Sequence, residues 1–336
     1  MSADIILSRS AARAPSRLAG AWRSLAGFAL LAALPLVFSD PFTLGMVTLS
    51  FLGAAASLAW NLSGGYAGQL SLGHAAFYGI GAYASTLLFL KAGISPLIGM
   101  WLGAAASAAA AVVLGAITMR LKGSFFVMST LAFGAVIHIS AINLRDLTGG
   151  SSGLSIPLQP SAANLIFADK IAYAYVALGL VAAYYAATRL IAGSKIGYSL
   201  VAFRENDDAA RALGIRTLPL RIGVFALSAA MISLCGTFHA QYYLYIDPDS
   251  VGSLNLSLNF ALMAIVGGLG TAYGPILGAL IVTAVAATMQ AHLGDQISGL
   301  TQLAYAVIVI AVLLAAPGGL GPALAKVLTR RLAWRP

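Results

Sequence analysis

The chain has 336 residues, of which 60% are hydrophobic and only 9% are charged, and its mean hydropathy is +0.90. Soluble domains carry about 25% charged residues, so the low charged fraction of this chain excludes a water-soluble fold. Its apolar runs are long and do not alternate with polar residues, which excludes the strands of a membrane β-barrel. The net charge of +9 fits basic residues gathered on the cytoplasmic side of a membrane protein, and no basic–aromatic groove pattern indicates nucleic-acid binding.

The N-terminal residues 1–23 form a basic arm in front of the first apolar stretch. The arm contains four arginines: Arg9, Arg13, Arg17 and Arg23. This arrangement resembles a signal peptide, but the residues that follow the apolar stretch, 37–41, contain no small-x-small cleavage site. We therefore expect an uncleaved first span, which opens a transmembrane permease domain of residues 24–317.

Apolar runs long enough to cross a bilayer recur along this domain. We expect an all-α, polytopic membrane protein of about ten spans, because helices satisfy their own backbone hydrogen bonds in lipid. Eight spans are the alternative if a glycine-rich break after the second or the eighth span belongs to a re-entrant element. The expected spans are 24–39, 42–60, 71–90, 94–119, 124–143, 170–189, 219–243, 255–270, 274–292 and 299–316.

Two glycine-rich breaks, at 59–68 and 264–270, interrupt long apolar runs in the two halves of the chain. Paired breaks point to a transport pathway, although glycine is also common wherever membrane helices pack closely. Polar side chains beyond the first break would be costly facing lipid, so we expect them to face protein or a pore. The residues predicted along a translocation path are Gly65, Gly68, Gln69, Ser71, His74, Asn143, Gly267 and Gly268.

The charges outside the spans are distributed unequally. With both termini in the cytoplasm, 16 of the 19 basic residues lie on the cytoplasmic side, and only Lys91, Arg145 and Lys170 lie outside. Cytoplasmic loops of membrane proteins carry the excess of lysine and arginine. We therefore expect cytoplasmic N and C termini, with a basic cytoplasmic tail at 318–336.

One polar segment, 193–221, holds eight of the 29 charged residues and lies in the cytoplasm in this topology. Within it, residues 204–215 are typical of a short helix, with Asn206 or Asp207 as N-cap and Gly214 as its stop. A helix of two turns is not stable alone in water, so we expect it to dock on a partner protein; a solvated loop is the alternative. The residues assigned to this docking helix are Arg204, Glu205, Asn206, Asp208, Ala209, Ala210, Leu213 and Gly214, with Ala209 and Ala210 as the small face that a partner approaches.

The motifs indicate neither an energy source nor a catalytic centre in this chain. No phosphate-binding loop occurs, and no carboxylate falls inside an expected span, where ion-driven carriers usually need one. The four histidines are too far apart for a metal site, and the single cysteine, Cys235, excludes an internal disulfide. We expect a transport subunit, not an enzyme, with no cofactor or metal and powered by another protein; a self-contained secondary carrier is the alternative of another class.

Several blocks of the sequence resemble the LivM-type permeases of branched-chain amino acid ABC importers. Asp208-Ala209-Ala210-x-x-x-Gly214 is similar to the E-A-A-x-x-x-G coupling loop of ABC importer membrane subunits, with Asp208 in place of the usual glutamate. The other blocks, spread over residues 42–317, are GYAGQLSLGHAAFYGIGAY at 65–83, TLAFG at 130–134, LTGGSSGL at 147–154, AFREN at 202–206 and MAIVGGLGTAYGP at 263–275.

The resemblance implies a type II ABC importer-like permease in the bacterial cytoplasmic (inner) membrane, with 193–221 as a cytoplasmic coupling loop. It implies four partners: a second, LivH-like permease, two cytoplasmic ATPase subunits and a periplasmic amino acid binding protein. The function that follows is the membrane-spanning subunit of an importer for branched-chain, hydrophobic amino acids, which forms half of the translocation path. Urea, short amides or other small polar solutes are the alternative substrates within the same family.

Overall fold

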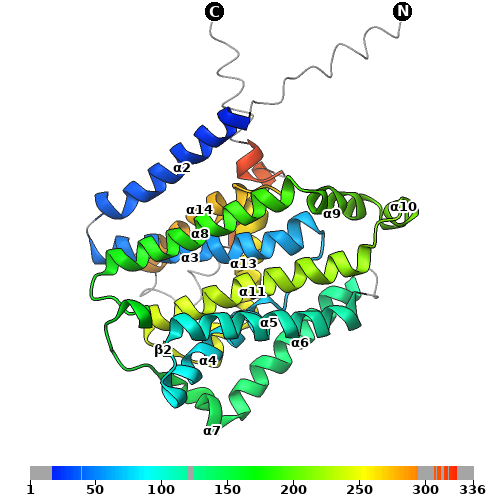
Figure 1. Cartoon of the computed structure of the whole chain (residues 1–336). Helices are drawn as coiled ribbons and strands as arrows, with labels where there is room; N and C mark the ends of the chain where they lie inside the picture. The colour runs from blue at the N-terminus through cyan, green and yellow to red at the C-terminus, as the bar shows by residue number, and fades with distance from the viewer. Residues whose placement is uncertain are drawn as a thin grey trace, which may run out of the picture.

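The computed structural model describes residues 17–38, 40–119, 124–293 and, with gaps, 306–323. Among these residues, eight helices are long and apolar enough to cross a membrane, and a shorter apolar helical stretch, Ser24–Val37, precedes them. The eight are Pro41–Tyr66, His74–Ala92, Pro96–Thr118, Ser124–Asn143, Lys170–Ala192, Thr217–Tyr243, Pro248–Gly267 and Gly274–Ala291. The chain is a multi-pass helical membrane protein (Figure 1).

Long helices follow one another along the chain, with short elements between them (Figure 1). The long helices are α2 (Arg17–Val37), α3 (Pro41–Asn61), α4 (His74–Ala92), α5 (Pro96–Thr118), α6 (Ser124–Asn143), α8 (Lys170–Ala192), α9 (Lys195–Glu205), α11 (Thr217–Tyr243), α13 (Leu254–Gly267) and α14 (Gly274–Leu293). The short elements are η1 (Leu62–Tyr66), α7 (Arg145–Thr148), η2 (Gly150–Ser152), β1 (Leu154–Ser155), η3 (Ala162–Asn164), α10 (Asp207–Ala212), β2 (Tyr245–Ile246) and α12 (Pro248–Gly252). The two strands pair antiparallel, with Leu154 opposite Ile246.

The expected spans between residues 42 and 292 each fall on a helix of the structure. The first expected span falls on α2, whereas most of the last one, 299–316, lies outside the described residues, so about ten spans stays a prediction. The structure differs from expectation at the first glycine break, because residues 61–66 are helical and include a π-helical turn. It also differs at the eighth span, which a separate helix, α12, extends back to Pro248.

Local chemistry explains where two of the long helices begin. The Asp40 carboxylate accepts hydrogen bonds from the backbone N–H groups of Phe42 and Thr43, at 3.2 and 3.1 Å, and so caps α3. The Ser95 hydroxyl caps α5 in the same way by accepting from the N–H of Leu97 at 3.3 Å. Both helices have proline at the first position, where its missing N–H would have no partner in any case.

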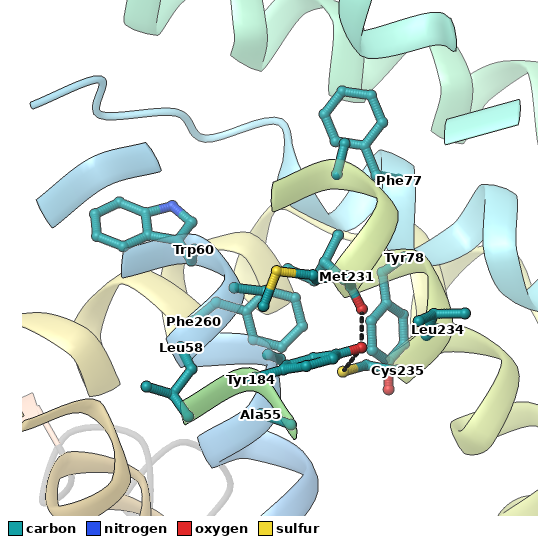
Figure 2. Packing of buried hydrophobic residues seen from close by; sticks show 14 of the residues in the cluster. Ala55, Leu58, Trp60, Phe77, Tyr78, Tyr184, Met231, Leu234, Cys235 and Phe260 are labelled. Atoms are coloured by element: carbon teal, nitrogen blue, oxygen red, sulfur yellow. Dashed lines mark hydrogen bonds between the residues drawn. The ribbon is translucent and has the colours of Figure 1, made fainter. Parts of the chain in front are cut away.

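The core lies where α3, α8 and α11 meet. α11 packs against α4 and α5, and α3 packs against α8 and α14. Figure 2 shows Tyr184 of α8 inside this core, donating its hydroxyl to the carbonyl oxygen of Met231, with the Cys235 sulfur 3.9 Å from the same hydroxyl. The only polar atom of a large buried ring thus has a partner, which a buried tyrosine usually requires.

α6, at the periphery of the bundle, exposes much more apolar surface than the core helices do. Only 11% of the most apolar stretch of α6 is buried within the chain, against 72% for the span of α3 and η1. Lipid or another membrane subunit must therefore cover the exposed face of α6. α9 and α10 lie together at the end of the bundle away from β2 (Figure 1).

Candidate coupling and translocation site

The polar loop 193–221 folds into two helices, α9 and α10, separated by Asn206. Ser194 caps α9, because its hydroxyl accepts the N–H of Ile196 at 3.2 Å. Asn206 has an extended backbone, and its Oδ1 accepts the N–H of Ala209 at 3.0 Å, so the predicted cap of the short helix is confirmed. The predicted segment began two residues too early, because Arg204 and Glu205 belong to the last turn of α9 instead.

The end of α10 also follows the predicted chemistry. Gly214 has a φ of +83°, in the left-handed region that favours glycine. The N–H of Ile215 reaches back to the carbonyl oxygen of Ala210 at 3.1 Å, which satisfies one of the last carbonyl groups of the helix. Gly214 therefore ends the helix, as expected.

Only part of the predicted docking helix faces away from the protein. Ala210 is buried, with 2% of its surface exposed, so it packs on its own chain and is unavailable to a partner. Asp208 and Ala209 are exposed, and Leu213 exposes 81% of its surface. These three residues, Asp208, Ala209 and Leu213, form what we call the docking surface, an apolar and acidic patch at the end of the bundle.

Asp207 links α10 to α11. Its Oδ2 lies 2.8 Å from Nη2 of Arg211 and 3.3 Å from Nη2 of Arg221, which is on α11. The guanidinium carbon of Arg221 also lies 4.8 Å from the centre of the Phe203 ring on α9. Charge-assisted hydrogen bonds and a cation–π contact therefore connect α9, α10 and α11.

Arg204 links α9 to the first glycine break. Its Nη1 donates to the carbonyl oxygen of Gly65 at 2.8 Å. Its stem lies against Gly68, where an added Cβ would come within 2.7 Å of the Arg204 Cγ atom. Gly68 also has a φ of +65°, so both the close approach and the backbone require glycine there. A side chain of the polar loop 193–221 thus rests directly on the break.

The two glycine breaks meet at Asn61. Its Oδ1 accepts the N–H of Gly270 at 2.9 Å, and its Nδ2 donates to the carbonyl oxygen of Thr271, also at 2.9 Å. An added Cβ on Gly65 would fall 2.6 Å from the nitrogen of Gly270, so the two segments touch. Asn61 was not among the predicted path residues, although an amide in an apolar run is a signal for a buried bridge.

Gly267 and Gly268 lie in the turn of the second break and line neither a cavity beside Arg204 nor one beside His138. Both are buried, and α13 ends at Gly267. Gly268 has a φ of +122°, and its N–H bonds the carbonyl oxygen of Ala264 at 2.9 Å. These two glycines therefore shape the turn that brings Gly270 to Asn61.

A cavity of about 400 Å³ opens beside Arg204. It is lined by Ala67, Gly68, Gln69, Leu70, Met119, Ser124, Phe126, Val127, Phe203, Arg204 and Arg221. Of the residues predicted along a translocation path, it contains Gly68 and Gln69. The guanidinium groups of Arg204 and Arg221 line this cavity, and each is paired with a carboxylate, of Glu205 and Asp207 respectively.

Ser71 and His74 lie in the packed core. They line neither the cavity beside Arg204 nor a second cavity that lies between α6, α12 and α13. Both are fully buried, and His74 Nε2 lies 2.9 Å from the hydroxyl of Ser228. Because that hydroxyl donates to the carbonyl oxygen of Ala59 at 2.6 Å, His74 is the donor in this pair. The histidine ring packs among three aromatic rings, those of Trp60, Phe77 and Phe225. The geometry therefore favours a packing role for His74 over a place on the path.

Asn143 is not brought together with the other predicted path residues. It is exposed at the last position of α6, and its amide donates to the carbonyl oxygen of Ile139 at 2.8 Å. Ser124, at the other end of the same helix, lines the cavity with Gln69. Val127 is the lining residue of α6 nearest to Asn143, and at 1.5 Å per residue the 16 positions between them correspond to about 24 Å.

Comparisons with known proteins place these features in context. The family described as "Branched-chain amino acid transport system / permease component" matches residues 42–317. The permease protein LivM of the high-affinity branched-chain amino acid transport system of Escherichia coli is 28% identical over 280 residues, which cover 75% of this chain and 66% of that protein. The chain thus spans slightly less than two thirds of the length of this relative.

Two further relatives extend the comparison. The permease protein LivH of the same kind of system in Salmonella typhimurium is 24% identical over 282 residues, which cover 80% of this chain and 91% of that protein. The autoinducer 2 import system permease protein LsrC of Yersinia pestis is 30% identical over 146 residues, which cover 41% of this chain and 40% of that protein. No solved structure matches the chain.

Proposed function

Because the chain belongs to the family of permease components of branched-chain amino acid transport systems, we propose that it is the membrane-spanning subunit of an ABC importer for these amino acids. It forms half of the translocation path and leaves ATP hydrolysis to other subunits. The LivM and LivH relatives support this substrate class. The alternative is that the importer carries other small polar solutes, including urea and short amides. The relative from an autoinducer 2 import system is the reason to keep this alternative.

The proposed topology has ten spans with both termini in the cytoplasm of a bacterial cell, in its cytoplasmic membrane. It is supported by the eight spanning helices, by α2 in front of them and by the 16 of 19 basic residues that this topology places inside. The end of the bundle that carries α9 and α10 then faces the cytoplasm, and the β1–β2 ribbon faces the outside.

The proposed partners are a LivH-like permease, two ATPase subunits and a periplasmic binding protein. The open apolar face of α6 supports a second membrane subunit, since the chain itself covers so little of it. The docking surface supports an ATPase, because an exposed leucine beside a small and an acidic residue suits a groove on another protein.

One observation carries the coupling proposal: Arg204 joins the loop that bears the docking surface to the glycine breaks. Motion of α10 reaches α9 and α11 through Asp207, reaches Gly65 through Arg204, and reaches Gly270 through Asn61. ATP closes the ATPase dimer and thereby favours one of two arrangements of these segments, which opens the path to one side. These links are hydrogen bonds, an ion pair and the cation–π contact between Arg221 and Phe203.

The test uses two exposed leucines at opposite ends of the protein. Leu213→Ser changes the docking surface, and Leu158→Ser, in the loop after β1, changes a leucine that is 67% exposed. In the assembled importer, we expect Leu213→Ser to lose co-purifying ATPase and ATP-driven leucine uptake, while Leu158→Ser retains both. Equal behaviour of the two variants would contradict the coupling proposal. Ion-gradient-driven uptake by this chain alone in vesicles would replace it with a secondary carrier.

A further inference from the structure

A second cavity, of about 240 Å³, lies where the span formed by α12 and α13 is interrupted. α12 ends at Gly252, α13 begins at Leu254, and Ser253 between them is extended, with φ −69° and ψ 151°. The cavity is bounded on its other side by α6 and by the segment before α4. Interrupted spans are where transporters commonly place a substrate, because backbone polar groups become available inside the membrane.

One end of this cavity is polar. The His138 ring donates from Nδ1 to the carbonyl oxygen of Pro248 at 3.1 Å, which fixes the ring against α12. Its Nε2 then lies 3.3 Å from Oδ1 of Asp249. The Asp249 side chain is 87% exposed, so its carboxylate has room to accept further hydrogen bonds. An exposed carboxylate at one end of an otherwise apolar cavity is suited to an ammonium group.

The rest of the cavity is apolar. Leu72, Leu131 and Leu254 line it, together with the small residues Ala75 and Ala135. Pockets for drug-sized molecules span about 300–1,000 Å³, so this volume suits a smaller ligand. A carboxylate at one end and three leucines around the remainder match a molecule with an ammonium group and a short branched aliphatic tail.

We propose that this cavity holds the amino acid during its passage, with Asp249 binding the ammonium group and the three leucines contacting the aliphatic side chain. Nε2 of His138, on α6, lies 3.3 Å from the same carboxylate. The proposal rests on the proposed function. The cavity beside Arg204 is a poorer match for this step, since none of its described lining residues is a carboxylate.

The first experiment replaces the carboxylate. Asp249→Asn is compared with the control Asp146→Asn, which changes an acidic residue of a different helix, α7. Both are measured in the complete importer reconstituted with its binding protein. Asp247, not Asp249, caps α12, so Asp249→Asn is expected to keep the wild-type melting temperature. Asp249→Asn is expected to lower ATP-driven leucine uptake by about tenfold or more, because the ammonium group loses a hydrogen bond to a charged group. Asp249→Glu is expected to restore part of the uptake, and Asp146→Asn to leave it unchanged.

The second experiment fills the cavity. Ala135→Phe places a ring among the lining leucines, whereas Ala132→Phe adds the same ring to an exposed position of α6 that does not line the cavity. We expect uptake to be lost in Ala135→Phe only, with ATPase subunits still bound to both variants.

The outcomes separate this inference from the proposed function. Wild-type importer that takes up no branched-chain amino acid overturns the proposed function, and this inference with it. Normal wild-type uptake that survives both Asp249→Asn and Ala135→Phe overturns the cavity assignment alone. The same holds if Asp146→Asn or Ala132→Phe reduces uptake as much as its partner variant.

Discussion

Replacing Arg204 by methionine tests how the coupling loop acts on the glycine breaks. Methionine keeps an unbranched stem over Gly68 but removes the donor that binds the Gly65 carbonyl oxygen at 2.8 Å. Hydrogen bonds to charged groups contribute about 1.5–3 kcal/mol, and we take the lower figure because 36% of the Arg204 side chain is exposed. At about 1.4 kcal/mol per factor of ten, the two-state equilibrium that couples loop and breaks shifts by about tenfold.

The assay measures uptake and ATP hydrolysis together in proteoliposomes that contain the complete importer. We expect Arg204→Met to lower the number of leucine molecules taken up per ATP by about tenfold, while ATP hydrolysis continues because the docking surface is intact. Arg216→Met is the matched control, since Arg216 is an exposed arginine of the same loop. An unchanged ratio in Arg204→Met, or an equal loss in Arg216→Met, would refute the reasoning.

Three further predictions concern stability, measured as the melting temperature of the purified protein in detergent. Gly65→Ala should destabilise the protein by about 1–3 kcal/mol, because its Cβ would meet the opposite break. Gly179→Ala, with open space around its Cβ, should not destabilise it. Equal melting temperatures of the two variants would contradict the close approach of the breaks. Asn61→Ala should cost about 1–3 kcal/mol by leaving two backbone groups without partners, and a wild-type melting temperature would show that they find others. Asp207→Ala should cost about 1 kcal/mol through its arginine partners, and Asp208→Ala, on the same helix but exposed, should cost less.

The spans could be predicted from sequence because the bilayer imposes their length and apolarity locally. Each run between residues 42 and 292 therefore matched a helix without knowledge of its neighbours. Helix ends were equally local: Asn206 and Gly214 begin and end α10 through contacts within a few residues. The start of α12 had a signal of the same kind, since Asp247 is a capping residue directly before Pro248.

The contacts that join these parts could not be predicted, because they connect residues far apart in the chain. Arg204 and Gly65 are 139 positions apart, and Asn61 and Gly270 are 209. Periodicity carries no information about such pairs. His74 shows the related difficulty with buried polar groups: a polar residue that cannot face lipid has either a pore or a buried partner, and only the fold reveals Ser228 as that partner. Ala210 was likewise assigned to a partner that turned out to be its own chain.

The most direct measurement of the central claim is a cross-link from the docking surface. The single native cysteine, Cys235, is fully buried, so Ala209→Cys provides one accessible thiol for a photoreactive maleimide, and Leu158→Cys provides the control at the opposite end. The account predicts that, in membranes that contain the whole importer, position 209 cross-links to an ATPase subunit and position 158 does not. An absence of ATPase adducts from position 209, with efficient labelling of the thiol, would contradict the claim that an external ATPase drives this chain through α10.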